Sequence, residues 1–109
     1  MSLKVVKYRT ANDDLIAIYE FIASDKAAPA ERFLRVADEA FQRIAAMPAI
    51  GRLWESPHPR LHGIRVYSMP DGFRNYQICY RRVGDVIEIL TIIHGARDLE
   101  KVFDRFQFE

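Results

Sequence analysis

Three side chains that could act on a phosphate group lie on or near predicted strands: Arg65, Arg81 and His94, with Arg97 just beyond them. If they converge, the arginines could stabilise developing negative charge and the histidine could transfer a proton. Ribonuclease chemistry needs such groups, because the 2′-hydroxyl must lose a proton and the leaving oxygen must gain one. Arg81, however, has Glu88 as a predicted partner across the ladder, which weakens it as a site candidate. A lone histidine at a strand end is also more often a structural group.

The sequence contains no nucleotide-binding, P-loop, zinc-protease or serine-hydrolase motif. The three histidines have no metal-ligand spacing, and Cys79 is the only cysteine, so we expect neither a metal nor a cofactor. A single thiol fits a reduced, cytoplasmic protein. No signal peptide or membrane-spanning apolar run is visible, so no membrane association is expected.

The chain has 109 residues, of which 50% are hydrophobic, and a formal net charge of +1. This length suits one domain over residues 1–109, with residues 99–109 forming a short C-terminal helix or tail. The near-neutral charge gives no strong attraction for nucleic acid or an anionic membrane. Twelve of the 16 cations are arginines, whose planar guanidinium suits recognition of carboxylates and phosphates.

The candidate residues surround a predicted β-hairpin, with strands over Phe73–Val83 and Val86–Ile93. Both strands are rich in Tyr, Ile and Val, and Gly84-Asp85 suits a two-residue turn. The register set by this turn places Asn75 opposite His94. One face of the hairpin should lie on the core. The second face mixes apolar and polar side chains and should stay partly open to water or to a partner.

The remaining elements follow from periodicity and turn residues: an edge strand over 3–9, two amphipathic helices, a loop over 48–59 and a strand over 61–69. Thr10 should cap the first helix, with Asp13 in its first turn, and Pro29 should lie in the first turn of the second. Trp54 should cover the core. The fold class is α+β: an N-terminal strand, a helical hairpin and a three-stranded antiparallel meander, with the helices on one face of the sheet.

Three segments occur in an order that resembles the ParE/RelE superfamily, the toxins of type II toxin–antitoxin systems. They are Pro48-Ala49-Ile50-Gly51-Arg52, Leu61-His62-Gly63-Ile64-Arg65 and His94-Gly95-Ala96-Arg97-Asp98. The resemblance spans roughly residues 5–98, and its C-terminal motif is most similar to the ParE-like, plasmid-stabilisation branch. The family fold packs a helical hairpin on one face of a twisted, mostly antiparallel sheet, as the periodicity also predicts.

The resemblance implies a toxin that a cognate antitoxin holds inactive in a hetero-oligomer. The disordered C-terminal segment of the antitoxin would fold as it wraps the toxin. Promoter repression would use the DNA-binding part of the antitoxin, so this chain alone is not expected to bind DNA sequence-specifically. ParE-like members poison DNA gyrase as binders rather than enzymes, whereas RelE-like members cut messenger RNA in the ribosomal A site.

The near-neutral charge favours gyrase as the target, because phosphate neutralisation dominates binding to ribosomal RNA. The chain also lacks the lysine-rich segment of the ribosome-dependent nucleases. In the ribonuclease alternative, Arg65 matches the family's strand arginine, His94 falls near its C-terminal catalytic position and Arg81 would stabilise charge. A third alternative is an inactive toxin fold that only binds partners.

Residues for binding the antitoxin or the target come from two regions. One is the strand arginine and the C-terminal motif, namely Arg65, Arg97 and Asp98. The other is the outer surface of the two helices, with Glu20, Arg35 and Arg43, against which we expect an amphipathic antitoxin helix to dock.

Overall fold

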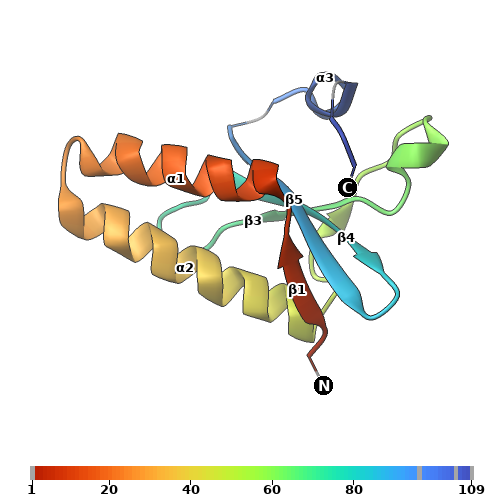
Figure 1. Ribbon diagram of the computed structural model, residues 1–109, viewed down its shortest axis with the longest axis horizontal. Coiled ribbons are helices and arrows are strands. Elements are labelled where there is room, and N and C mark those ends of the chain that lie inside the picture. The colour runs from red at the N-terminus through yellow and green to blue at the C-terminus, as the bar shows by residue number, and fades with distance from the viewer. Residues whose placement is uncertain (1, 96, 105, 109) are drawn as a thin grey trace.

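The computed structural model describes residues 2–95, 97–104 and 106–108. In chain order the elements are β1 (Lys4–Lys7), α1 (Arg9–Ala23), α2 (Ala27–Ala46), β2 (Arg52–Leu53), a 3-10 helix (Pro59–Leu61), β3 (Arg65–Ser68), β4 (Tyr76–Val83), β5 (Val86–His94) and α3 (Leu99–Asp104). The five strands form one sheet in the order β1-β5-β4-β3-β2, in which β1 runs parallel to β5 and the other pairs are antiparallel. The predicted α+β fold is confirmed, and Figure 1 shows α1 and α2 side by side, with α3 apart from both.

The helical hairpin covers one face of the sheet, which we call the helix face. Apolar residues at helical spacing on α1 and α2, among them Leu15, Phe33 and Ile44, pack there against Ile78 and Ile89. The predicted cap of the first helix is wrong. The helix begins at Arg9 after an extended Tyr8 that makes no side-chain cap, and its first turn contains no acidic residue. Thr10 and Asp13 therefore lie inside the helix, because the chain turns directly out of β1.

The hairpin follows the predicted register from the turn as far as Tyr80, which pairs with Ile89. A β-bulge then shifts the pairing by one residue, so Tyr76 and not Asn75 lies opposite His94. The extra residue in β5 breaks the strict alternation that the prediction assumed. As a consequence, Ile92 packs on the helix face and Ile93 on the opposite face.

The prediction that the second face of the sheet stays partly open is wrong. This face carries a second core. Its buried residues are Tyr8, Leu61, Ile64, Val66, Cys79, Leu90, Ile93, Leu99 and Phe103. The cover comes from α3 and from the segment between β2 and β3. Trp54 packs against this second core, so its predicted covering role is confirmed, although on the second face.

The loop predicted over residues 48–59 contains the short strand β2, and the strand predicted over 61–69 is limited to β3. Pro59 starts a 3-10 turn that ends at Leu61, so the chain reaches the sheet only at Arg65. Successive residues of β3 face opposite sides of the sheet, since Val66 lies in the second core and Tyr67 packs on the helix-face core. None of the described helices is long and apolar enough to cross a membrane.

Candidate functional site

An apolar groove of about 260 Å³ lies between α1 and the end of the hairpin, lined by Ala17, Ile18, Phe21, Tyr76 and His94. Phe21 is 74% exposed, so its ring is available to a ligand or partner that enters the groove. The small side chain of Ala17 leaves room beside that ring. The groove continues into a second hollow that adds Asp14 and Arg97 to its lining.

The bulge in β5 places His94 in this groove. Asp14 on α1 accepts hydrogen bonds from the Thr91 hydroxyl and from the backbone N–H of Ile92, the latter at 2.9 Å. These bonds attach α1 to the strand where its alternation changes. His94 then points toward the helix face, where its ring lies 4.9 Å from the ring of Tyr76. The groove thus combines apolar walls with an exposed imidazole.

Arg65 anchors the segment after α2 instead of facing the groove. Its guanidinium donates a 2.8 Å hydrogen bond to the carbonyl of Gly51. The buried Tyr80 hydroxyl donates to the carbonyl of Pro48 and accepts from the backbone N–H of Gly51, at 2.7 and 2.9 Å. Burial raises the pKa of Tyr80, so the hydroxyl stays protonated and keeps donating. A Cβ on Gly51 would meet the Tyr80 ring and hydroxyl at 2.8 Å, which explains why glycine occupies this position.

Arg81 points into the second face and is fully engaged there. It donates a 2.7 Å hydrogen bond to Glu88 and a 3.2 Å bond to the hydroxyl of Tyr8, and its guanidinium lies 4.4 Å from the ring centre of Phe108. The predicted pair with Glu88 is confirmed. A guanidinium with these partners is a structural group rather than a ready ligand for phosphate.

The structure does not bring the three candidate catalytic residues together. Arg65 pairs with Tyr80, whereas His94 pairs with Tyr76, four residues along the same strand. That separation corresponds to about 13 Å along the sheet. Arg81 lies on the opposite face from the groove. The convergence on which the phosphate-cleaving hypothesis depended is therefore absent from the described residues.

The other predicted contact residues are spread over the surface. Glu20 and Arg35 are exposed on α1 and α2, and Arg43 donates a 3.1 Å hydrogen bond to the Tyr67 hydroxyl, which raises the pKa of Arg43. Asp98 accepts a 3.0 Å bond from the backbone N–H of Glu100 at the start of α3, so it has a structural role. Arg97 is exposed and lines the end of the groove.

Groups for metal binding or thiol chemistry are not apparent in the part of the chain that the structure describes. No cluster of three or more His, Cys, Asp or Glu side chains is arranged there to hold a metal. Cys79 is buried, and burial raises the pKa of its thiol to about 12, so the reactive thiolate is disfavoured.

Comparison with known proteins agrees with the fold and the motif order. The structure resembles the chromosomal ParDE toxin–antitoxin system from P. aeruginosa, with a TM-score of 0.70, 21% identity and coverage of 87% of this chain and 98% of the other. It also resembles the RelBE2 toxin–antitoxin complex from Mycobacterium tuberculosis, with a TM-score of 0.60, 21% identity and coverage of 86% and 99%. These are proteins of the ParE/RelE toxin fold.

The family model for the ParE toxin of type II toxin–antitoxin systems, parDE, matches residues 6–99, so the chain belongs to this family. The predicted resemblance to the ParE/RelE superfamily is confirmed, and so is the predicted similarity to its ParE-like branch. No curated protein sequence matches the chain.

Sequence reasoning missed most of the groove. It identified His94 and Arg97 but not Ala17, Phe21 or Tyr76. Phe21 falls at the i+4 position from Ala17, off the stripe formed by Leu15, Ile18 and Ile22. The position of Phe21 outside the apolar stripe was therefore the one sequence signal that could have pointed to a binding surface on this helix.

Proposed function

We propose that this ParE-family toxin arrests growth in the cytoplasm by inhibiting DNA gyrase, and that a cognate antitoxin protein neutralises it. The match to the ParE family over residues 6–99 is the observation that carries this proposal. ParE-like toxins act by binding gyrase, so such a protein needs a suitable surface and no catalytic centre.

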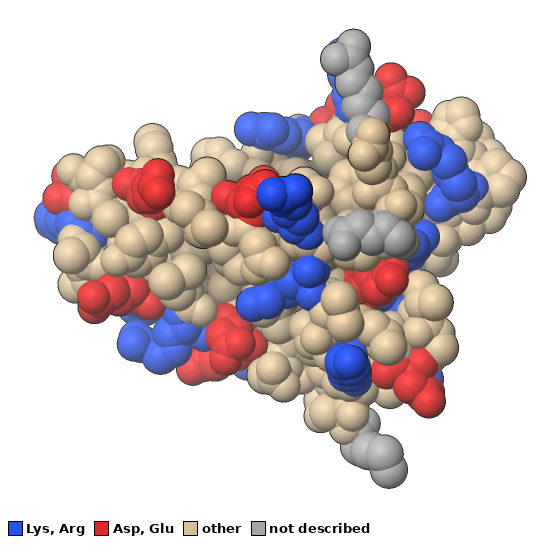
Figure 2. Space-filling view, viewed as in Figure 1, with Lys and Arg blue, Asp and Glu red and all other residues tan. Residues whose placement is uncertain are grey.

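The distribution of charge supports gyrase over the ribosome as the target. The net charge is +1, and Figure 2 shows basic and acidic side chains interspersed on the face that carries the helical hairpin. A protein that docks on ribosomal RNA gains most of its affinity by neutralising phosphates. The separation of Arg65, Arg81 and His94 also supports gyrase over the ribosome. Among the described residues, these three side chains do not form one site that could bind a phosphate and transfer a proton.

The groove between α1 and the hairpin is the surface that we assign to the antitoxin. An amphipathic helix of the partner would place apolar side chains between Phe21 and Tyr76, and an acidic side chain near His94 and Arg97. This assignment moves the expected contact from the outer charges of the helices, at Glu20, Arg35 and Arg43, to the apolar edge of α1.

A supercoiling assay with purified gyrase and antitoxin-free toxin tests the proposed target. We expect loss of supercoiling activity with accumulation of cleaved DNA, and we expect the cognate antitoxin to reverse both. Folded toxin that leaves gyrase unaffected but cuts messenger RNA on purified ribosomes would contradict the proposal. Arg65→Ala and His94→Ala would then be the first variants to test. If the folded toxin has neither effect and its expression is harmless, the third alternative, an inactive partner-binding protein, holds.

The antitoxin surface has a separate test. Phe21→Ser should weaken antitoxin binding by about tenfold or more, because it removes an aromatic contact at the centre of the groove. Ile16→Ser is the matched control: Ile16 is 56% exposed on the same helix but does not line the groove. Equal affinity of both variants in calorimetry would place the antitoxin elsewhere.

A further inference from the structure

The groove between α1 and the hairpin combines a projecting ring with a hollow beside it. Phe21 is largely exposed, and the small residue Ala17 lies four positions earlier, on the same side of α1. A cavity of about 150 Å³ can hold a benzene ring, and this hollow measures about 260 Å³. The surface of α1 therefore carries both an aromatic ring and a space large enough to receive another one.

A surface that carries a projection and a matching hollow can pair with a second copy of itself. Two copies of α1 that pack antiparallel about a two-fold axis would place Phe21 of each copy beside Ala17 of the other. Figure 1 shows α1 at the margin of the molecule, with no described element beyond its C-terminal half on the side away from α2. This part of the helix is therefore accessible to another molecule of the toxin.

The charges at the two ends of the groove are complementary in this antiparallel arrangement. Arg97 is exposed in the hollow that continues the groove toward the N-terminal part of α1. Asp25 is exposed at the other end, one helical turn beyond Phe21. Because the two helices would run in opposite directions, Asp25 of one copy would lie toward Arg97 of the other. Among the described residues, neither of these side chains forms an ion pair within the chain.

Asp25 does not serve the stability of its own helix. It follows the C-cap of α1, and an acidic side chain is unfavourable at this end of a helix, where the backbone carbonyls concentrate negative charge. The other acidic group of the groove, Asp14, is held toward β5 by the hydrogen bonds from Thr91 and Ile92. Asp25 is therefore the carboxylate that can reach the guanidinium of Arg97 in a second copy.

We propose that the antitoxin-free toxin forms a two-fold dimer through this groove. The Phe21 ring of each copy lies in the hollow of the other, and Asp25 pairs with Arg97 at both ends. One face of a single helix buries less area than a standard interface, so the dimer is weak and its population depends on concentration. An antitoxin that uses the groove competes with the second copy. That competition rests on the proposed antitoxin contact, whereas the dimer depends on the toxin alone.

Sedimentation velocity of the full-length toxin tests the dimer without gyrase or antitoxin, so a negative result leaves the proposed function untouched. We expect the average mass to rise with toxin concentration. Phe21→Ser should weaken the dimer by about tenfold or more. Ile16→Ser is the control and should leave the dimer unchanged, since Ile16 is exposed on α1 but does not line the groove. A toxin that stays monomeric up to about 1 mM, or a dimer that Phe21→Ser does not weaken, overturns the proposal.

An exchange of the two charges tests the antiparallel arrangement itself. Asp25→Arg and Arg97→Asp should each weaken the dimer by about fivefold, because like charges would then meet at both ends of the interface. The double variant restores opposite charges, so its dimer should be as stable as that of the wild type. Both positions are exposed, so the variants should keep the wild-type melting temperature. A double variant that dimerises no better than the single variants overturns the proposal.

Discussion

On the helix face of the sheet, two helices of 15 and 20 residues bury a continuous apolar cluster. On the second face, a six-residue helix, a 3-10 turn and irregular backbone cover a smaller one. A helix satisfies its own backbone hydrogen bonds, so a helix that covers a sheet needs little besides apolar contact with it. Irregular backbone needs side chains or water as partners. The two faces therefore show how the same sheet is covered by regular and by irregular structure.

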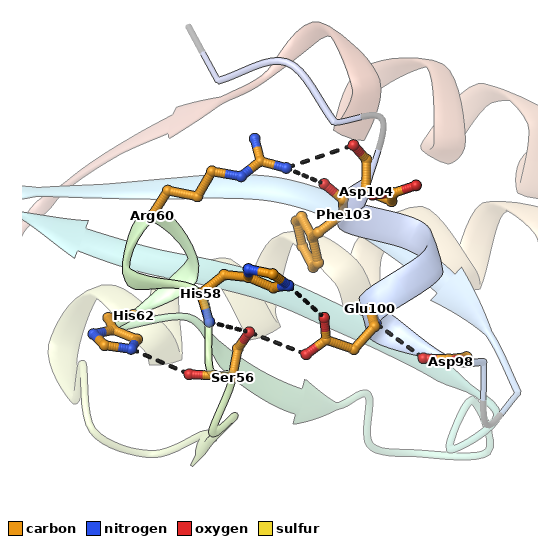
Figure 3. A network of polar contacts seen from close by, with 8 residues as sticks. All are labelled: Ser56, His58, Arg60, His62, Asp98, Glu100, Phe103 and Asp104. Atoms are coloured by element: carbon orange, nitrogen blue, oxygen red, sulfur yellow. Dashed lines mark hydrogen bonds and ion pairs between the residues drawn. The ribbon is translucent and has the colours of Figure 1, made fainter.

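On the second face, side chains supply hydrogen bonds to the irregular backbone and join its segments. Figure 3 shows the Ser56 hydroxyl between the backbone N–H of His58 and the Glu100 carboxylate, at 3.2 and 3.0 Å. Arg60 donates to the carbonyl of Phe103 at 3.0 Å, at the C-terminal end of α3, where a cation is favourable. These bonds attach α3 to the segment before β3. Because these contacts involve short segments and not α1 or α2, we expect this cover to detach without unfolding of the helical hairpin.

The largest expected effect compares one buried ring on each face. Phe33→Ala and Phe103→Ala should each lower the free energy of unfolding by about 3–5 kcal/mol, since both side chains are fully buried. Hydrogen exchange should separate them. Phe103→Ala should lose protection mainly in α3 and residues 54–62, whereas Phe33→Ala should lose it throughout the sheet. The same pattern in both variants would show that the two faces form one cooperative unit.

Alkaline pH should weaken the second face through Cys79. The pKa of its thiol rises from 9.0 to about 12 because burial disfavours the thiolate. The unfolded chain ionises first, so the stabilisation is complete below pH 9 and is lost as the pH rises toward 12. The loss amounts to about 4 kcal/mol at most. Urea unfolding at several pH values measures it. Cys79→Ala should give a flatter profile above pH 9, and an unchanged profile would contradict the assignment.

On the helix face, Gly51→Ala should destabilise the protein by about 1–3 kcal/mol through overpacking. The added methyl group would collide with the Tyr80 ring and hydroxyl and approach the Val66 carbonyl at 3.0 Å. Thermal melting measures the effect. Ala49→Ser, at an exposed position in the same segment, is the control and should change the free energy of unfolding by less than about 0.5 kcal/mol. A neutral Gly51→Ala would show that Tyr80 can move aside.

The smallest expected effect comes from the contacts of Glu100. Glu100→Ala removes the hydrogen bond from Ser56 and the 3.6 Å ion pair with His58. Both partners of that ion pair are largely exposed, so the loss should be about 0.5–1.5 kcal/mol and confined to α3. Hydrogen exchange of residues 99–104 measures it. A larger, global loss would show that the polar contacts and not the buried rings hold the second face.

The helix face was predictable because its pattern is regular. The apolar stripe of α2 follows the helical period, and of its predicted residues only Leu34 is exposed, whereas Phe33, Ala37, Ala40, Phe41 and Ile44 are buried. The hairpin register was predictable only as far as the bulge. A bulge has no periodic sequence pattern, and here the residues beside it are hydrogen-bonded to Asp14, which is distant in the sequence.

The second face and the groove could not be predicted for a different reason. The buried side chains of the second face come from short, aperiodic segments such as 54–64 and 99–104, whose cover is visible only after folding. Arg65 and Arg81 were correctly placed on strands, and His94, predicted directly after a strand, is the last residue of β5. Their separation followed from which way each side chain points and from the anchoring role of Arg65.

The parallel pairing of β1 with β5 has a consequence for the order of folding. β1 lies at residues 4–7, and its only neighbour in the described sheet is the strand at residues 86–94. During synthesis the first strand therefore has no partner until nearly the whole hairpin has been made. Pairs so distant in sequence close late and slowly. The nascent toxin thus carries its helical hairpin, complete at Ala46, without the complete sheet that supports it until His94 has been made.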